Sequence, residues 1–170
     1  MNVFFGLGSK IEPFVRDGLT RSLPPSKLAM MIDIAGAIPL PLLHPELLSL
    51  TGHPELEVRV SVARALGGLG IPVPEVIAAL DDLTHDEAWE VQAQAYKSLG
   101  RLRSRGSLDI LTRGLFSPQW FCRRNAGFSL AGLGKNGIQR LKQIATQQDD
   151  VFASDMARMV LEDLVHFKAG

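Results

Sequence analysis

Small and apolar residues recur along this chain at the spacing of one helix face, and the same local pattern returns several times. Four leucines mark the copies, at intervals of 33, 31 and 31 residues: Leu66, Leu99, Leu130 and Leu161. In the first copy, Val58, Val62, Leu66 and Leu69 stand at positions i, i+4, i+8 and i+11. This spacing predicts one helix per copy, with its apolar face turned towards a core.

Shorter apolar segments lie between these copies, at about 76–83, 108–115 and 138–145. A fainter copy of the leucine pattern precedes the first, around Met31 to Ile38. The repeating unit is therefore predicted to be helix, turn, helix. The sequence predicts a short tail or cap segment and one domain of five helix pairs, with these bounds: 1–9 for the segment, 10–166 for the domain, and about 10–38, 39–70, 71–102, 104–134 and 135–166 for the pairs.

Residues that favour helix ends lie between the predicted helices. Each leucine-marked helix follows a polar, often proline-containing turn, such as His53-Pro54-Glu55 and His85-Asp86-Glu87. The prolines at 39, 41 and 45 predict a short or kinked first helix in the second pair. We expect the glycines near the ends of the leucine-marked helices to accept left-handed turns there: Gly67, Gly68, Gly70 and Gly100.

One stretch has the form Pro54-Glu55-x-x-Val58-Arg59-x-x-Val62-Ala63-x-Ala65-Leu66-Gly67-x-Leu69-Gly70, and partial copies follow it. On these residues the chain resembles HEAT and HEAT-like repeats in their short bacterial form, over about residues 10 to 166. The resemblance implies an all-α, right-handed α-α solenoid, an armadillo-like superhelix of about five helix pairs. It also implies a protein-binding scaffold that presents a concave helical surface. Because no set of polar groups converges in the sequence, we expect this scaffold to be non-catalytic.

Composition limits the classes of function. Hydrophobic residues make up 46% of the chain and charged residues 21%, which excludes a disordered chain. Eighteen basic and 18 acidic residues give a net charge of zero, which argues against a general polyanion binder. The single cysteine, Cys122, fits a reducing compartment such as the cytoplasm and is expected to be a buried hydrophobe. We find no spacing of residues that indicates a catalytic, metal or cofactor site.

The candidate binding surface consists of second-helix positions that point away from the predicted core. These positions are charged towards the N-terminal half and apolar towards the C-terminal half, and the candidate partner-binding residues are Arg64, Lys97, Phe121, Arg124, Phe128, Phe152 and Met159. Exposed aromatic residues beside an arginine are typical of protein-binding hot spots. The alternative is that a small error in helix phase places these phenylalanines in the core.

Two other functions remain open. The basic residues between 97 and 124 could bind nucleic acid, although the cluster is small. A chromophore lyase subunit with HEAT-like repeats would be expected to pair with a second, homologous chain.

Trp89 and Trp120 share one repeat position, which favours a structural role for both at a helix start.

Overall fold

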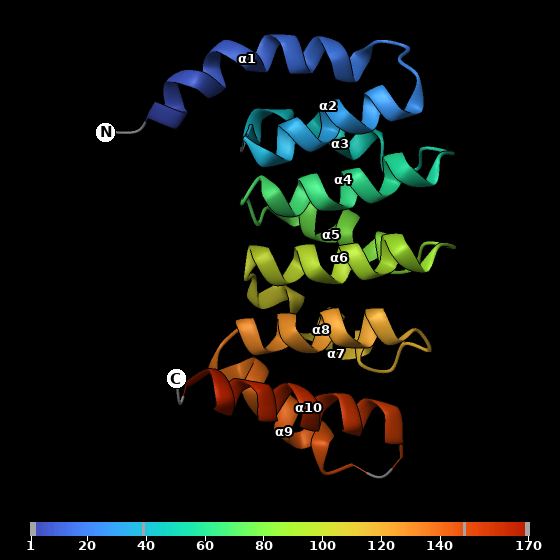
Figure 1. Ribbon diagram of the computed structural model, residues 1–170, viewed down its shortest axis with the longest axis vertical. Coiled ribbons are helices and arrows are strands. Elements are labelled where there is room, and N and C mark those ends of the chain that lie inside the picture. The colour runs from blue at the N-terminus through green and yellow to red at the C-terminus, as the bar shows by residue number, and fades with distance from the viewer. Residues whose placement is uncertain (1–2, 39, 148, 169–170) are drawn as a thin grey trace.

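The structure is a computed structural model that describes residues 3–38, 40–147 and 149–168, and within these ranges it contains helices and no strand. Its α-helices follow one another as stacked pairs (Figure 1). In chain order they are α1 (Val3–Thr20), α2 (Pro25–Ala37), α3 (His44–Ser49), α4 (Leu56–Gly68), α5 (Pro74–Leu83), α6 (Trp89–Leu102), α7 (Leu108–Gly114), α8 (Trp120–Gly132), α9 (Lys135–Ala145) and α10 (Val151–Lys168). Short 3-10 turns, Pro41–Leu43 and Arg105–Ser107, precede α3 and α7.

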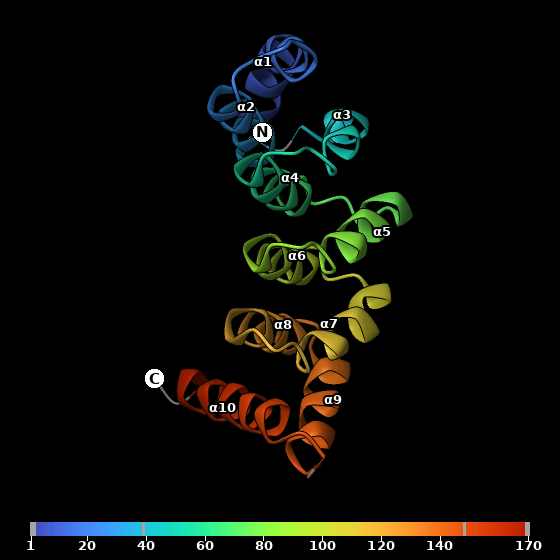
Figure 2. The same ribbon diagram turned by 90° about the vertical axis from the view of Figure 1, so that its right-hand side faces the viewer.

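The helices form two layers (Figure 2). The second helices of the pairs, α2, α4, α6, α8 and α10, form one layer, and consecutive members pack against each other. The shorter helices α3, α5, α7 and α9 form the other layer, on the side towards which the stack bulges. The second helices therefore line the inner side of the curve. The predicted fold class is confirmed: the chain is an all-α solenoid built of helix pairs.

The repeated leucines fill the junctions between neighbouring pairs. Leu66, Leu99 and Leu130 are fully buried and belong to one core that runs through the stack. Leu161, on α10 at the C-terminal end of the described stack, is only half-buried. The hydrophobic core therefore runs along the whole stack, and each unit buries its apolar face against the next one, as the repeat spacing predicts.

The first unit differs from the sequence prediction in one respect, and the second unit agrees with it. Helix α1 begins at Val3, so residues 3–9 continue the first helix and do not form a separate segment. Helix α1 packs on α2 and α3, at the N-terminal end of the stack. The first helix of the second pair, α3, has six residues, in agreement with the proline-based expectation.

The predicted left-handed turn is found at Gly70 but not at Gly67, Gly68 or Gly100. Gly68 is the last residue of α4 and lies against the backbone of Gly36. Gly67 and Gly100 lie inside α4 and α6, where neighbouring second helices approach closely. A Cβ atom at Gly100 would lie 2.2 Å from Ser129 Oγ, and one at Gly67 would lie 2.5 Å from Ser98 Cβ. Gly70, with φ +70°, does adopt the left-handed conformation. Helix packing between units, rather than a turn, therefore accounts for Gly67 and Gly100.

This close approach predicts the effect of adding a single methyl group. Gly100→Ala is expected to lower the free energy of unfolding by about 1 to 3 kcal/mol, because α6 and α8 must move apart. The loss occurs although alanine favours a helix interior by about 1 kcal/mol. Gly132→Ala is the matched control, since a Cβ there meets nothing within 4 Å. Urea unfolding compares the two variants, and equal stabilities would contradict the packing explanation.

Candidate functional site

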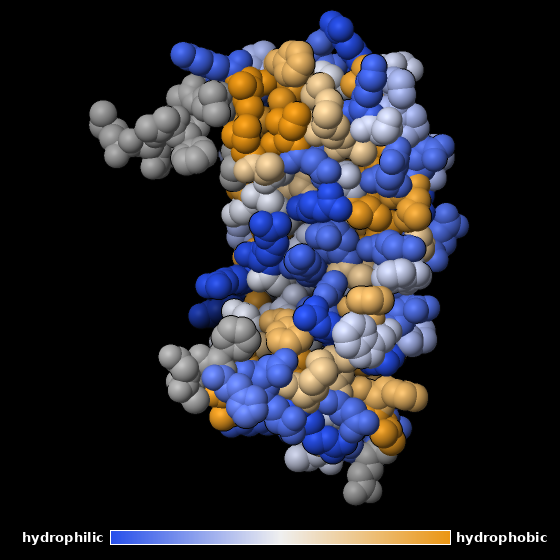
Figure 3. Space-filling model, in the orientation of Figure 1, coloured by the Kyte–Doolittle hydropathy of each residue, from blue (hydrophilic) through white to orange (hydrophobic). Residues whose placement is uncertain are grey.

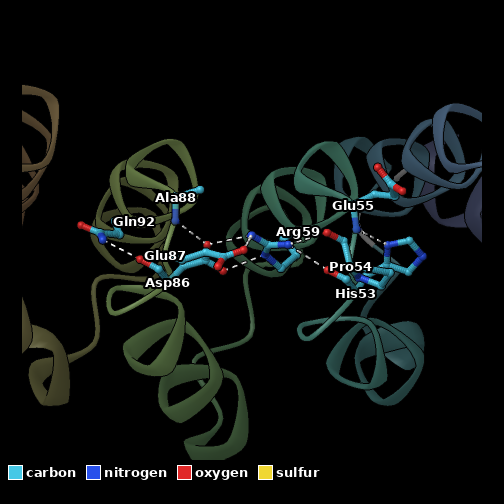
Figure 4. A network of polar contacts seen from close by, with 8 residues as sticks. All are labelled: His53, Pro54, Glu55, Arg59, Asp86, Glu87, Ala88 and Gln92. Carbon is cyan, nitrogen blue, oxygen red and sulfur yellow. Dashed lines mark hydrogen bonds and ion pairs between the residues drawn. The ribbon is translucent and has the colours of Figure 1, made fainter.

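A buried ion pair holds the loops that precede two of the second helices (Figure 4). The Arg59 guanidinium donates from Nε to Asp86 Oδ2 at 2.8 Å and from Nη2 to Asp86 Oδ1 at 3.0 Å. Its Nη1 donates to the carbonyl oxygens of His53 and Pro54, at 3.0 and 2.9 Å. The hydrogen bond with Asp86 raises the pKa of Arg59. Arg59 thereby joins the turn before its own helix to the turn before the next one.

Asp86 also fixes the start of α6. Its Oδ1 accepts a hydrogen bond of 2.9 Å from the backbone N–H of Ala88, just before the first turn. The Gln92 side chain donates to the Asp86 carbonyl oxygen at 2.6 Å, from the repeat position that Arg59 occupies in α4. These contacts set where α6 begins, and so they position Trp89, its first residue.

Arg123 has the same place in α8 but a different partner in the next unit. Its Nη1 donates to the carbonyl oxygens of Ser117 and Pro118, at 2.8 and 3.0 Å, as Arg59 does in its own turn. In place of a carboxylate, its guanidinium faces the ring of Phe152 on α10, 5.2 Å from the centroid. Arg123 therefore connects the turn before α8 with the start of α10 through an aromatic ring rather than through a carboxylate.

Aromatic side chains gather at the first turns of α6, α8 and α10. We call Trp89, Trp120, Phe121 and Phe152 the aromatic edge. Trp89 stacks on Phe121 with 5.2 Å between ring centroids, and Trp120 meets Phe121 edge-on at 5.0 Å. All four are exposed, from 38% for Trp89 to 69% for Phe152. Exposed apolar surface of this kind, gathered along one side of a molecule, is typical of an interaction site.

A shallow groove of about 570 Å³ lies next to this edge, between α6 and α8 on the inner side of the stack. We call it the basic groove, because its charged lining residues are Lys97, Arg101, Arg103 and Arg124 and no acidic residue lines it. Phe128 forms part of its wall. Figure 3 shows hydrophilic side chains across the middle of this face.

Arg124 connects the groove with the aromatic edge. Its guanidinium lies 5.9 Å from the Trp120 ring centroid and 5.0 Å from that of Phe128. The polar neighbours of Arg124 are engaged elsewhere: Asn125 Nδ2 donates to the Ala93 carbonyl oxygen at 2.8 Å, and Ser129 Oγ donates to that of Tyr96 at 3.0 Å. The cationic side chains are therefore the strongest hydrogen-bond donors that the groove offers.

The structure brings some of the candidate residues together and separates others. Lys97, Arg124 and Phe128 meet at the basic groove, and Phe121 and Phe152 lie on the aromatic edge. Phe128 and Met159 are half-buried, so none of the three candidate phenylalanines lies in the core. Arg64, on α4, is engaged in an ion pair of 2.8 Å with Asp33, outside the groove.

The sequence pattern predicted a structural role for Trp89 and Trp120, so neither was among the candidate binding residues. Trp89 does pack at a helix start against the next unit, through Phe121, but it and Trp120 both remain exposed. The available signal was the recurrence of a large aromatic residue at a position where the other units have Leu56 and Val151, which are exposed as well. Arg101 and Arg103 were visible in the sequence only as part of the local basic bias.

The described residues offer little for other chemistry. Cys122 is fully buried, and burial raises the pKa of its thiol, so it is a poor nucleophile. In the described ranges, no three or more His, Cys, Asp or Glu side chains are grouped so that they could hold a metal ion. Among the same residues, no helix combines the length and the apolar character that crossing a bilayer requires.

Helix pairs stacked in two layers around a continuous core define an α-α solenoid. Residues 79–162 match the family model for HEAT repeats, which covers α6 to α9 and parts of the helices on either side. The predicted resemblance to HEAT repeats is therefore confirmed for this segment of the chain. No curated protein matches the chain significantly.

Solved structures that resemble the chain include three engineered proteins from the Northeast Structural Genomics Consortium. One matches with a TM-score of 0.57 and 17% identity, over 86% of this chain and 77% of its own. A second has a TM-score of 0.59 and 19% identity, over 87% of this chain and 46% of its own. A third has a TM-score of 0.56 and 19% identity, over 92% and 80%. At these identities the likeness concerns the fold alone.

Proposed function

We propose that this solenoid is a non-catalytic scaffold that binds another protein through the inner side of its C-terminal half. The observation that carries the proposal is the aromatic edge, in which Trp89, Trp120 and Phe121 touch one another while remaining exposed. Tryptophan, tyrosine and arginine are the residues most enriched in binding hot spots, and the edge adjoins both Arg123 and Arg124. A partner that covers the edge would bury this apolar surface.

In the N-terminal half, charged side chains on the same side pair with each other. Arg64 and Asp33 neutralise each other there through both carboxylate oxygens, at 2.8 and 3.0 Å. Lys97 occupies the repeat position of Arg64 one unit later and has no acidic partner among the described residues. This difference supports placing the contact between α6 and α10.

Two other functions have less support than protein binding. Nucleic acid is disfavoured because the chain carries 18 basic and 18 acidic residues. A chromophore lyase subunit remains the alternative, and copurification with a homologous chain or a pigment-protein would favour it. A cytoplasmic location in a bacterial cell belongs to the same proposal, supported by the single cysteine.

Affinity capture with matched variants tests the proposal. Phe121→Asp places a charge within the aromatic edge, and we expect it to abolish capture of one specific partner from an extract of the source cells. Phe14→Asp is the control, because Phe14 is also exposed but lies on α1 at the other end of the stack. Both variants should keep wild-type helical content by circular dichroism. Equal capture by the wild type and Phe121→Asp would refute the assigned surface.

A further inference from the structure

We propose that the basic groove binds an acidic segment of the partner protein, with carboxylates on its cations and an apolar side chain against Phe128. The inference rests on the proposed function and adds the chemistry of the partner. Lys97 and Arg101 reach the groove from α6, and Arg124 reaches it from α8. Arg103, the residue directly after α6, lines the groove as well. Four cations and no carboxylate in one groove are complementary to an acidic ligand.

Among the residues that the structure describes, no carboxylate forms an ion pair with the groove cations. In the described part of the chain, the ion pairs involve other arginines: Arg16, Arg21, Arg59, Arg64, Arg113, Arg140 and Arg158. Arg101 lies in the last turn of α6, where the helix dipole favours a positive charge. Lys97 and Arg124 lie outside the last turns of α6 and α8, so the dipole does not account for them.

Arg124 is held in place before any ligand arrives. The rings of Trp120 and Phe128 lie near its guanidinium, at 5.9 and 5.0 Å, and restrict its conformations. Its planar N–H groups match the two oxygens of a carboxylate. Asn125 Nδ2 and the Ser129 hydroxyl each already donate one hydrogen bond to a backbone carbonyl. The charged side chains are the strongest donors of the groove, and they favour a carboxylate over a neutral amide.

The limited extent of the positive charge favours a protein segment over nucleic acid. On the neighbouring second helices, Asp33 pairs with Arg64 and Asp155 pairs with Arg158, so the cations stay confined to the junction of α6 and α8. A nucleic-acid backbone carries charge at every nucleotide and gains affinity from a long series of cations. A short acidic segment with an apolar residue needs only this one groove and its Phe128 wall.

Fluorescence anisotropy with a defined probe tests the inference. The probe is a fluorescein-labelled peptide of alternating glutamate and leucine, and the control probe replaces every glutamate with glutamine. The wild-type protein is expected to bind the glutamate peptide at least about tenfold more tightly than the glutamine peptide. Lys97→Gln and Arg124→Gln should each weaken binding about tenfold. Lys142→Gln, which removes an exposed charge from α9, should leave it unchanged.

Several outcomes would overturn the inference. The first two are equal binding of both peptides and equal effects of all three substitutions. The last two are tighter binding of a labelled oligo-dT, with the same dependence on Arg124, and displacement of the peptide by micromolar inorganic phosphate. The last two would assign the groove to nucleic acid or to a phosphate group. If Phe121→Asp abolishes partner capture while the glutamate peptide does not bind, only this inference fails and the proposed function stands.

Discussion

Asp86→Ala is expected to lower the free energy of unfolding by about 3 to 5 kcal/mol, because it leaves the buried Arg59 guanidinium without its counter-charge. Both side chains are only 9% exposed, so little water can solvate the Arg59 charge once its partner is removed. Glu87 also contacts Arg59, at 3.2 Å, but its side chain is 86% exposed and compensates little. The loss of the hydrogen bond to Ala88 N–H adds to the effect at the start of α6.

Two further variants make this prediction specific. Asp33→Ala removes the carboxylate of an exposed pair with Arg64 and is expected to cost at most about 1 kcal/mol. The double variant Arg59→Met with Asp86→Ala removes both buried charges and should recover most of the lost stability. Urea unfolding measures all three. A double variant as unstable as Asp86→Ala alone would show that packing or the contact with Ala88 matters more than the unpaired charge.

The fold could be predicted from the sequence because its signal is periodic. The spacing of Leu66, Leu99, Leu130 and Leu161 sets the length of the unit, and a unit of two helices can bury its apolar face only against another unit. The half-buried state of Leu161 fits the same argument, because within the described residues α10 packs mainly on α8 and α9.

Contacts between units could not be predicted in the same way, because they depend on how two neighbouring repeats pack and not on the sequence of one repeat alone. The partner of Arg59 lies in the turn before the next helix, 27 residues away, and the same position in α8 uses Phe152 instead. Gly100 looks like a helix end in the sequence but is required by the nearness of Ser129.

The candidate site was visible as residue types but not as a geometry. The exposure of Phe128 depends on the rotation of α8 about its axis, which periodicity defines too coarsely to decide between core and surface. The aromatic edge arises because Trp89 from one unit stacks on Phe121 of the next, in a register that only the packed helices establish. The basic groove likewise needs α6 and α8 side by side.

Leu99→Ala should cost about 2 to 5 kcal/mol, because the side chain is fully buried between units and its removal leaves a cavity there. The same substitution at the equivalent position of the last unit, Leu161→Ala, is expected to cost clearly less, since that leucine is half-buried. Arg124→Ala, an exposed change, should alter stability by no more than about 0.5 kcal/mol. Urea unfolding should therefore rank the losses as Leu99, Leu161, Arg124. The reverse order would mean that the core and surface faces of these helices are exchanged, and with them the aromatic edge and the basic groove.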